Sequence, residues 1–363
     1  MLVCLVSWSK TTQPHFIYAK MKKVLIIQNL IPHYREPLYN ELSKYYDVAL
    51  LHSGQESVKG TDAYKEYVVP AKKIGQFILQ QKVFGALRKG NYDVVIAMFD
   101  LHWLNNLLAV FMKRNKRFLL WGHRYNRNRL TNKLRDLLMG FVDGVILYSD
   151  SEIPMMTLRG VNPSKLFVAP NTIHVSNYSD GSSAYKDSFL FTGRAQKRKK
   201  IDTFIRAFSD VIDRIPSNTK INIVGSGEEN HKLANLAKQF GISDRVIFHG
   251  EIVDDEKLKP FFHSAYAYVS PGPVGLGVLH SFAYGVPVVT DRSGRHGPEF
   301  DNLINNENSL LYNTYDEFKN ILISLSNDHA LSVRLGRNAY ELYAHERTIE
   351  KMVEGFRQAI EGV

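Results

Sequence analysis

The chain has 363 residues, a length beyond what one hydrophobic core usually supports, so we expect two domains. Lys and Arg outnumber Asp and Glu by 46 to 36, and the resulting net charge of +10 favours anionic partners such as nucleotides, phospholipid headgroups or nucleic acid. Cys4 is the single cysteine, which excludes an intramolecular disulfide and a cysteine zinc cluster. These features favour a protein of the reducing cytoplasm.

The first twenty residues differ from the rest of the chain. The apolar run 2–6 is short, lacks a basic segment before it and leads to no small-residue cleavage site, so it makes a poor signal peptide. Residues 21–27 resemble a natural translation start that runs directly into a buried strand. We expect residues 1–20 to be an N-terminal extension. Because no run reaches the ~20 apolar residues of a membrane-spanning helix, we expect any membrane contact to be peripheral, at the cytoplasmic face of the inner membrane.

From residue 24 onward, short β-rich apolar runs alternate with longer amphipathic stretches, which is typical of parallel sheets with crossover helices. The pattern predicts two doubly wound, Rossmann-like α/β domains, residues 21–178 and 187–345, separated by a polar, flexible segment within residues 174–186. Residues 346–363 hold apolar side chains at helical spacing, so we expect a C-terminal helix that crosses back to the first domain. The predicted strands are 24–28, 48–52, 94–97, 118–121, 145–148 and 166–169, then 189–192, 221–224, 246–249, 267–269 and 286–290.

The first strand leads into a loop, residues 29–36, that combines hydrogen-bonding, cationic and aromatic side chains. His33 and Arg35 in this loop suit binding of a ligand, and the alternative is that they serve packing and capping. A later strand, 118–121, ends in Gly122 and His123. His123 is our candidate active-site histidine, and the alternative is a loop histidine at a strand end.

Basic residues gather in residues 113–117 and again in residues 124–135, with leucines, Tyr125 and Met139 interleaved. Such a basic amphipathic surface attracts anionic lipid. We therefore expect peripheral contact with an anionic membrane. The alternative is a partly buried helix with solvated cations.

In the second series of strands, residues 193–200 form a dense cationic loop after strand 189–192. Ligands bind at the carboxyl edge of open α/β sheets. Arg194 and Lys199 can therefore clamp a diphosphate and neutralise the charge of a leaving phosphate. Gly193 and Gly225 make turns at the same edge. The alternative for this loop is a solvated charge run.

The segment 271–290 places a glycine-rich turn before a predicted helix and a short apolar strand. Gly275, Leu276 and Gly277 lie at the start of this helix, where a ligand can approach the backbone closely and free N–H groups favour an anion. The segment therefore predicts a phosphate or pyrophosphate site. An ordinary loop, helix and strand unit is the alternative.

These motifs, in this order, resemble the donor domain of retaining glycosyltransferases with the two-domain GT-B fold, and are most similar to glycosyltransferase family 4. The resemblance covers nearly all of residues 21–363 and is strongest over residues 189–299. It implies a UDP- or GDP-sugar donor bound in a cleft between the domains, with Arg194 and Lys199 holding the diphosphate and the amides of residues 275–277 assisting. It also places His123 near the donor sugar. In such a transferase, His33 and Arg35 suit acceptor binding.

The chain departs from the family pattern in the glycine segment. Family members usually carry two glutamates eight positions apart, one near the donor sugar and one on the ribose hydroxyls, whereas this chain has Gly272 and His280 there. His280 can still hydrogen-bond a ribose hydroxyl or a phosphate, or it packs as a helix histidine. Glu299, in a Gly-Pro-Glu turn that also resembles the family, is then the remaining candidate carboxylate, or a glutamate that favours a helix dipole.

We expect a retaining, metal-independent glycosyltransferase without a bound cofactor, acting on a glycan or lipid-linked acceptor in bacterial surface polysaccharide synthesis. The sequence contains no Asp-x-Asp triplet of the kind that holds a divalent metal in the other major transferase fold. Two alternatives stay open: a catalytically degenerate scaffold that binds nucleotide-sugar, and a nucleotide-sugar epimerase on the same fold. Nucleic-acid binding is not expected, because recognition motifs are absent.

Overall fold

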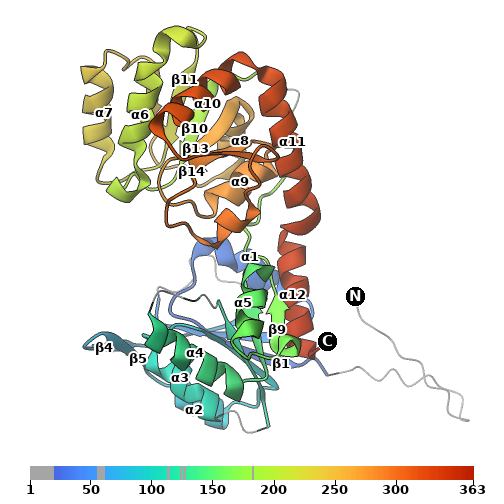
Figure 1. The fold of residues 1–363 in the computed structure, drawn as a ribbon. Helices are drawn as coiled ribbons and strands as arrows, with labels where there is room; N and C mark the ends of the chain where they lie inside the picture. Colours follow the sequence, from blue (N-terminus) through green and yellow to red (C-terminus); the bar gives the residue numbers. More distant parts are fainter. Residues whose placement is uncertain (1–19, 55–61, 113–114, 123–124, 126–127, 182–183) are drawn as a thin grey trace, which may run out of the picture. The chain divides into compact units, whose positions relative to one another are not determined.

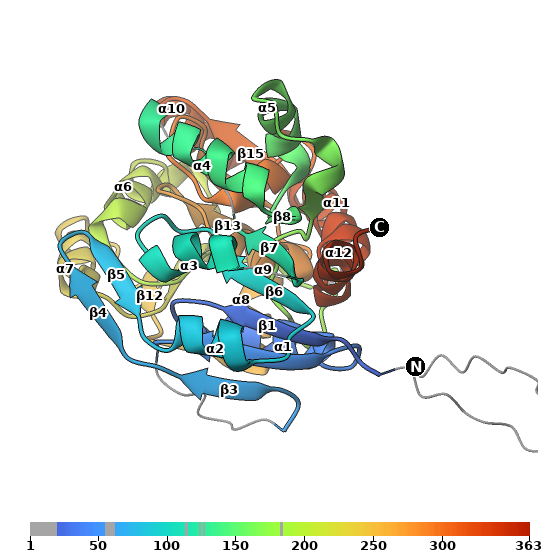
Figure 2. The same cartoon turned by 90° about the horizontal axis from the view of Figure 1, so that it is seen from below.

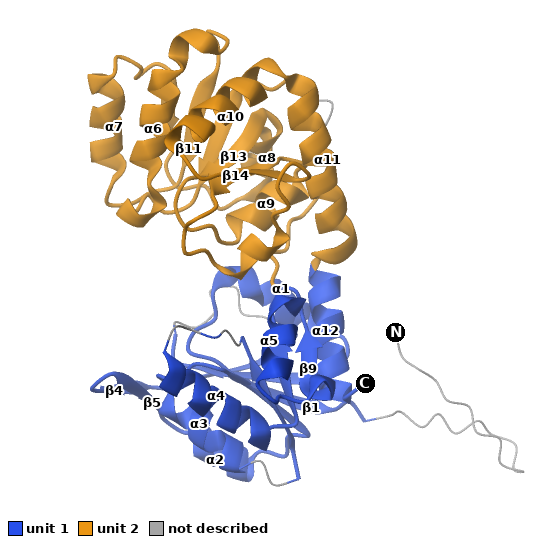
Figure 3. Cartoon of the chain, in the orientation of Figure 1, with its two compact units in different colours: residues 1–170, 349–363 blue, residues 171–348 orange. Residues whose placement is uncertain are grey.

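The fold is known from a computed structural model, which describes residues 20–54, 62–112, 115–122, 125, 128–181 and 184–363 (Figure 1). The chain forms two compact units, residues 1–170 with 349–363, and residues 171–348 (Figure 3). Over the described residues, none of the helices combines the length and the apolar character needed to cross a bilayer.

Unit 1 is built on a seven-stranded sheet in the order β3-β2-β1-β6-β7-β8-β9, with every neighbouring pair parallel. Both faces of this sheet are covered, so its central strands are apolar throughout. Along β1, Val24 and Ile26 enter one core, whereas Leu25 and Ile27 enter the other. The strands are β1 (Lys23–Ile27), β2 (Asp47–His52), β3 (Lys65–Val68), β6 (Val94–Met98), β7 (Arg117–Trp121), β8 (Gly144–Leu147) and β9 (Leu166–Val168).

Two helical layers cover the sheet of unit 1 (Figure 2). One layer holds α1 (Glu36–Leu42) and α12 (Ile349–Glu361). The other holds α2 (Val83–Lys89), α3 (Leu104–Ala109), α4 (Arg129–Phe141) and α5 (Ile153–Leu158). A small antiparallel hairpin, β4 (Ala71–Ile74) with β5 (Phe77–Gln80), belongs to the same unit.

Unit 2 repeats the architecture with a six-stranded parallel sheet in the order β12-β11-β10-β13-β14-β15. Its strands are β10 (Ser188–Thr192), β11 (Lys220–Val224), β12 (Val246–Phe248), β13 (Ala265–Ser270), β14 (Val288–Asp291) and β15 (Ser309–Tyr312). Helices α6 (Ile201–Asp210), α7 (Asn230–Gln239) and α10 (Tyr315–Asn327) cover one core. Helices α8 (Asp255–His263) and α9 (Gly277–Ala283) cover the other, and α11 (His329–Glu346) contributes to both.

The two parallel sheets confirm the predicted α/β fold class with two Rossmann-like domains. Every predicted strand is present to within a few residues, but the prediction missed β3, β4, β5 and β15. The predicted strand 286–290 begins only at Val288, after Pro287. The segment predicted as a flexible linker lies in unit 2, where Ser179 N–H donates to the carbonyl of Ala283 at 3.0 Å and Lys186 Nζ donates to that of Ala265 at 3.0 Å.

The last helix, α12, packs on the sheet of unit 1. Met352 and Phe356 are buried in the same core as Trp121, whose ring meets that of Phe356 edge-on at 4.8 Å. Gly355 lets the helix lie directly on β9, because an added Cβ would be 2.1 Å from the carbonyl oxygen of Val168. Helix α12 is therefore an integral layer of this unit.

Candidate functional site

The sheet of unit 2 has a topological switch point between β10 and β13. From β10 the chain winds outward to β11 and β12, then returns to β13 on the other side of β10. In sheets of this kind, the loops after the two strands at the switch diverge and leave a crevice for ligands. Residues 193–200 follow β10 and residues 271–276 follow β13, so the two predicted phosphate-binding segments both begin at this point.

Two glycine turns lie against each other at the carboxyl ends of β10 and β11. Gly193 has φ +127° and Gly225 has φ +134°, a conformation that favours glycine. The N–H of Gly193 donates to the carbonyl of Val224 at 2.9 Å. A Cβ on Gly225 would lie 2.0 Å from the carbonyl oxygen of Gly193, so glycine at position 225 is needed for this packing.

Lys199 joins the cationic loop to the glycine segment. Its carbonyl accepts from the N–H of Gly272 at 3.0 Å, and its Nζ donates to the carbonyl of Pro273 at 2.5 Å. Burial and, to a smaller extent, the charge of Arg198 lower the pKa of Lys199 to about 8, with Glu299 opposing both. The ammonium group is thus held in a site that disfavours its charge, and a bound anion would relieve this cost.

The glycine segment approaches its surroundings closely at some positions and is open at others. A Cβ on Gly272 would lie 2.1 Å from the carbonyl oxygen of Arg198, and one on Gly277 would lie 2.5 Å from Oη of Tyr268. Around Gly275, by contrast, no atom of the described residues other than its chain neighbours would come within 4 Å of an added Cβ. Leu276 is the N-cap residue of α9. Space beside the backbone is therefore available at Gly275.

Glu299 lies in the 3₁₀ turn Pro298–Asn302 and is buried, with 6% of its surface exposed. Its Oε1 accepts a hydrogen bond of 2.6 Å from Nδ2 of Asn171. Because Glu299 raises the pKa of Lys199 through its charge, the two side chains share one electrostatic environment. The structure thus brings together Lys199 and Glu299, two of the four candidate catalytic residues.

His296 is a site neighbour that the sequence analysis missed. Its Nδ1 accepts from the N–H of Val274 at 3.2 Å, and its Nε2 lies 2.7 Å from the carbonyl oxygen of Asp291. Nε2 is therefore the protonated nitrogen of a neutral ring. Burial lowers the pKa of His296, as do Lys199 and Lys200, while Asp291 opposes them. His296 thus ties the glycine segment to β14.

His280 is buried on α9 with 8% of its surface exposed. Its ring packs at 4.8 Å from that of Phe262 and 5.6 Å from that of Tyr284, and its Nε2 lies 3.2 Å from Oδ1 of Asp255 on α8. Burial raises the pKa of Asp255, but contacts with His280, the N–H of Ser176 and His174 outweigh it and lower the pKa overall. This environment agrees with the alternative that His280 packs as a helix histidine. Its role in donor binding stays a prediction.

The remaining predicted residues fall in separate places. Arg194 is exposed on the loop after β10 in unit 2. In unit 1, His33 is exposed, whereas Arg35 is buried, with its guanidinium carbon 5.2 Å from the ring centre of Trp121 and its Nη1 3.3 Å from Sδ of Met352. Arg35 is thus part of the core that α12 completes, and acceptor binding by His33 or Arg35 stays a prediction. His123 lies outside the described residues.

Asn171 was also missed, because its partner Glu299 lies 128 positions away and no local pattern links them. Among the residues that the structure describes, no group of three or more His, Cys, Asp or Glu side chains is placed to hold a metal ion.

Comparison with known proteins finds a family model and relatives that match part of the chain. Residues 180–342 match the family model "Glycosyl transferases group 1". An uncharacterized glycosyltransferase of Methanocaldococcus jannaschii is 31% identical over 141 residues, 38% of this chain and 35% of that protein. The lipopolysaccharide core biosynthesis glycosyltransferase LpsE of Rhizobium meliloti is 30% identical over 173 residues, 46% of this chain and 48% of LpsE. The chain thus spans between a third and a half of these two relatives.

Solved structures share the fold of almost the whole chain. The Anabaena HepE structure in complex with UDP superposes with a TM-score of 0.72 at 16% identity, over 94% of this chain and 100% of HepE. A glycosyltransferase structure from Rickettsia africae superposes with a TM-score of 0.73 at 12% identity, over 94% of this chain and 98% of that one. The chain therefore has the α/β GT-B fold, and its residues 180–342 match the group 1 glycosyltransferase family model.

Proposed function

We propose that the chain is a retaining glycosyltransferase that moves a sugar from a UDP- or GDP-sugar to a glycan or lipid-linked acceptor in bacterial surface polysaccharide synthesis. The reaction takes place in the cytoplasm and needs neither a metal nor a cofactor. In this proposal Arg194 and Lys199 hold the diphosphate, with the backbone at Gly193, Gly225, Gly275, Leu276 and Gly277 around it. His123 and Glu299 act near the donor sugar, His280 contacts the nucleoside, and His33 and Arg35 serve the acceptor.

The observation that carries the proposal is the environment of Lys199. This cation sits at the switch point of a parallel sheet, with its pKa lowered to about 8 by burial. It lies beside the glycine segment, which leaves open space at Gly275. A nucleoside diphosphate would supply negative charge beside Lys199 and so favour its ammonium form. Charge-assisted hydrogen bonds from the lysine would strengthen as the sugar leaves and negative charge grows on the phosphate.

The comparisons favour particular choices within this proposal. HepE was solved with UDP and with UDP-glucose, which favours a uridine donor. LpsE acts in lipopolysaccharide core biosynthesis by its name, which favours a surface glycan as product. Retention and metal independence follow from the resemblance of the sequence to glycosyltransferase family 4.

A second candidate, a scaffold that binds nucleotide-sugar without turnover, is favoured by one observation. The usual first glutamate of the family is replaced by Gly272, where an added Cβ would be 2.1 Å from the carbonyl oxygen of Arg198. The carboxylate is therefore missing and the present loop leaves no room for it. The scaffold would bind a nucleotide but release no nucleoside diphosphate from any donor. An epimerase would interconvert two nucleotide-sugars without an acceptor, and nothing in the site favours it.

Thermal unfolding with UDP, GDP, CMP, TDP and ADP tests donor binding, with Arg194→Ala as the control. A ligand at ~100-fold over its Kd stabilises the native state by about 2.7 kcal/mol, which is a readily measured shift. We expect UDP or GDP to raise the melting temperature of the native chain and not that of Arg194→Ala. The absence of a shift with every nucleotide would refute the proposal.

Release of nucleoside diphosphate from UDP- and GDP-sugars, measured with and without EDTA, then separates transferase from scaffold. We expect turnover that EDTA leaves unchanged. Loss of turnover in EDTA, restored by Mg²⁺ or Mn²⁺, would contradict metal independence while leaving the transferase assignment in place. Nucleotide binding without turnover across a panel of donors and acceptor extracts would favour the scaffold.

A further inference from the structure

One helical layer of unit 1 carries large apolar side chains that point away from the core. On α4 they are Leu130, Leu134, Leu137 and Phe141, and on the neighbouring segment Leu104–Met112 they are Leu108 and Phe111. Leu130 is 76% exposed, Leu137 59% and Phe111 62%. The rings of Phe111 and Phe141 meet at 5.2 Å, so the two segments form one surface, here called the α3–α4 apolar face.

The spacing on α4 produces this surface. Leu130, Leu134, Leu137 and Phe141 recur every three or four residues, so they form a single stripe along a helix of about 20 Å. Leu138 and Met139 point the other way, into the core of unit 1. Helix α4 is therefore apolar on its outer face as well as its inner face, although a helix on the surface of a globular protein is normally polar outside.

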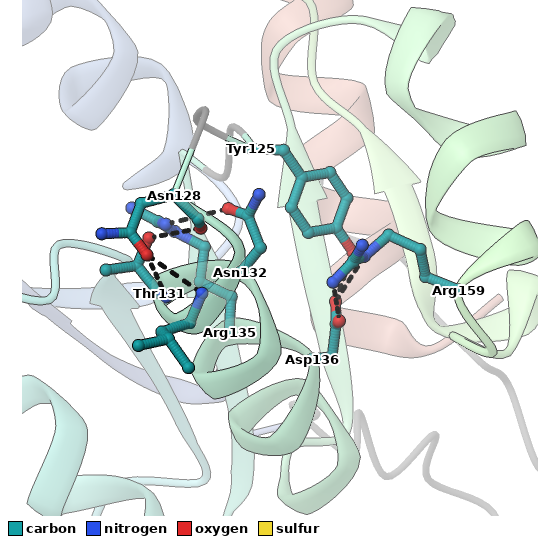
Figure 4. A network of polar contacts seen from close by, with 8 residues as sticks. Tyr125, Asn128, Thr131, Asn132, Arg135, Asp136 and Arg159 are labelled. Atoms are coloured by element: carbon teal, nitrogen blue, oxygen red, sulfur yellow. Dashed lines mark hydrogen bonds and ion pairs between the residues drawn. The ribbon is translucent and has the colours of Figure 1, made fainter.

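Polar contacts fix the orientation in which α4 presents the stripe (Figure 4). At its start, Oδ1 of Asn128 accepts from the N–H groups of Leu130 at 2.9 Å and Thr131 at 3.2 Å. In its middle, Asp136 accepts from the hydroxyl of Tyr125 at 2.6 Å and forms an ion pair with Arg159, which follows α5. The outward direction of the leucines is thus held by contacts at the end and along the side of the helix.

The sequence of the segments that form this face is rich in cations, and two of these cations are exposed beside the stripe. Residues 101–135 contain nine Lys or Arg residues and no Asp or Glu. Arg129 and Lys133 are exposed on α4, and Lys133 lies three residues after Leu130 and four before Leu137, so it borders the stripe. Asp136, the next carboxylate in the sequence, forms an ion pair with Arg159 and accepts a hydrogen bond from the hydroxyl of Tyr125.

We propose that the α3–α4 apolar face docks on the surface of an anionic lipid bilayer, with its leucines and phenylalanines in the interfacial region and Arg129 and Lys133 on the headgroups. An exposed apolar stripe bordered by cations is the pattern of helices that lie in the plane of a membrane interface. A protein partner would fit the apolar stripe equally well, and the exposed Arg129 and Lys133 beside the stripe are what favours anionic lipid. The inference does not depend on the proposed transferase activity.

Sedimentation of the full chain with vesicles tests the proposal. We expect binding to phosphatidylglycerol vesicles but not to phosphatidylcholine vesicles, and weaker binding at 500 mM salt than at 50 mM because salt screens exposed charges. The double variant Leu130→Gln with Leu137→Gln removes apolar surface and no charge, and should bind at least tenfold more weakly. Arg129→Gln with Lys133→Gln should weaken binding to the anionic vesicles as well.

The matched control is Val253→Gln, which removes an exposed apolar side chain in unit 2, 71% exposed, and should bind as the native chain does. Thermal unfolding shows whether each variant is folded, and nucleotide binding and turnover are measured separately. Absence of binding to anionic vesicles, equal binding to both vesicle types, or unchanged binding of the leucine variant would each overturn the proposal. Light scattering that shows a dimer for the native chain and a monomer for the leucine variant would instead assign the face to self-association.

Discussion

Asn171 donates a hydrogen bond of 2.6 Å to Oε1 of Glu299, and both side chains are buried in unit 2. A carboxylate in such a place needs donors, because a buried charge without hydrogen bonds is costly. This pair allows the structural and chemical roles of Glu299 to be separated by two variants.

Glu299→Gln should leave the free energy of unfolding within about 1 kcal/mol, because the amide oxygen still accepts from Asn171. If the carboxylate takes part in sugar transfer, kcat should fall by about 100-fold while the Kd for UDP changes little. Asn171→Ala should instead lower the free energy of unfolding by about 1–3 kcal/mol, since it removes a donor to a buried charge. Urea unfolding and steady-state kinetics measure these effects. Full activity of Glu299→Gln would leave Glu299 a purely structural residue.

Lys199 should make nucleotide binding depend on pH. Its pKa of about 8 in the free protein means that the ammonium form, which attracts phosphate, is lost as pH rises through 8. A bound diphosphate raises the pKa of the lysine, so binding near pH 8.5 should take up protons and weaken as pH rises further. Calorimetry in two buffers of different ionisation enthalpy measures the uptake.

Two variants of Lys199 control this prediction. Lys199→Arg keeps its charge at every pH used and should show no uptake and a flatter pH profile. Lys199→Met should bind UDP about 10- to 100-fold more weakly, in line with loss of a hydrogen bond to a charged group. The same pH dependence in Lys199→Arg as in the native chain would assign the titration to another group.

Gly272 and Gly275 provide a matched pair of glycine substitutions. An alanine Cβ at position 272 would be 2.1 Å from the carbonyl oxygen of Arg198, so Gly272→Ala should destabilise the protein by about 1–3 kcal/mol. Gly275→Ala meets open space and should change stability by less than about 0.5 kcal/mol. If the diphosphate approaches the backbone at Gly275, this second variant should nevertheless weaken UDP binding. Chemical unfolding and nucleotide titration of both variants test this, and an unaltered UDP affinity in Gly275→Ala would place the phosphates elsewhere.

Arg35 should contribute to the stability of unit 1 through the aromatic rings around it. Its guanidinium carbon lies 5.2 Å from the ring centre of Trp121, 5.3 Å from that of Tyr34 and 5.6 Å from that of Tyr148. Arg35→Met keeps much of the volume but loses these cation–π contacts, each worth about 0.5–2 kcal/mol, so the melting temperature should fall and tryptophan emission should shift. Arg35→Lys is the control that keeps the charge. A variant with native stability but impaired acceptor use would instead support the proposed role of Arg35 in acceptor binding.

Sequence patterns predicted most of the strands that line a core and missed two strands that are almost wholly exposed. Strands such as β1 and β10 are buried on both faces, so their apolar runs are continuous. By contrast, β3 and β4 are almost wholly exposed, as in the run Ala71–Ile74, and hydrophobic pattern carries no signal for them. The edge strand β15 was missed although it is mostly buried, and its apolar run is confined to Leu310–Tyr312 between polar residues.

The candidate site was predictable where its residues follow strands and unpredictable where they meet through space. Lys199 and the glycine segment each follow a strand of one parallel sheet, so their common edge could be inferred from strand order. The contacts of Asn171 with Glu299 and of Arg35 with Met352 join residues 128 and 317 positions apart, and only tertiary packing creates them. The contact of His280 with Asp255 could not be predicted from local sequence either, because Asp255 lies on another helix.

The packing of α12 on unit 1 has a consequence for the order of folding. Helix α12 supplies Met352, Val353, Phe356 and Ile360 to a core that otherwise consists of residues before position 170. On the ribosome, all of residues 171–348 are therefore made before that core can close. Unit 2 is continuous in sequence and can complete its two cores first, whereas β9 and the other strands under α12 await the synthesis of α12. The first unit to be translated is thus the last to be finished.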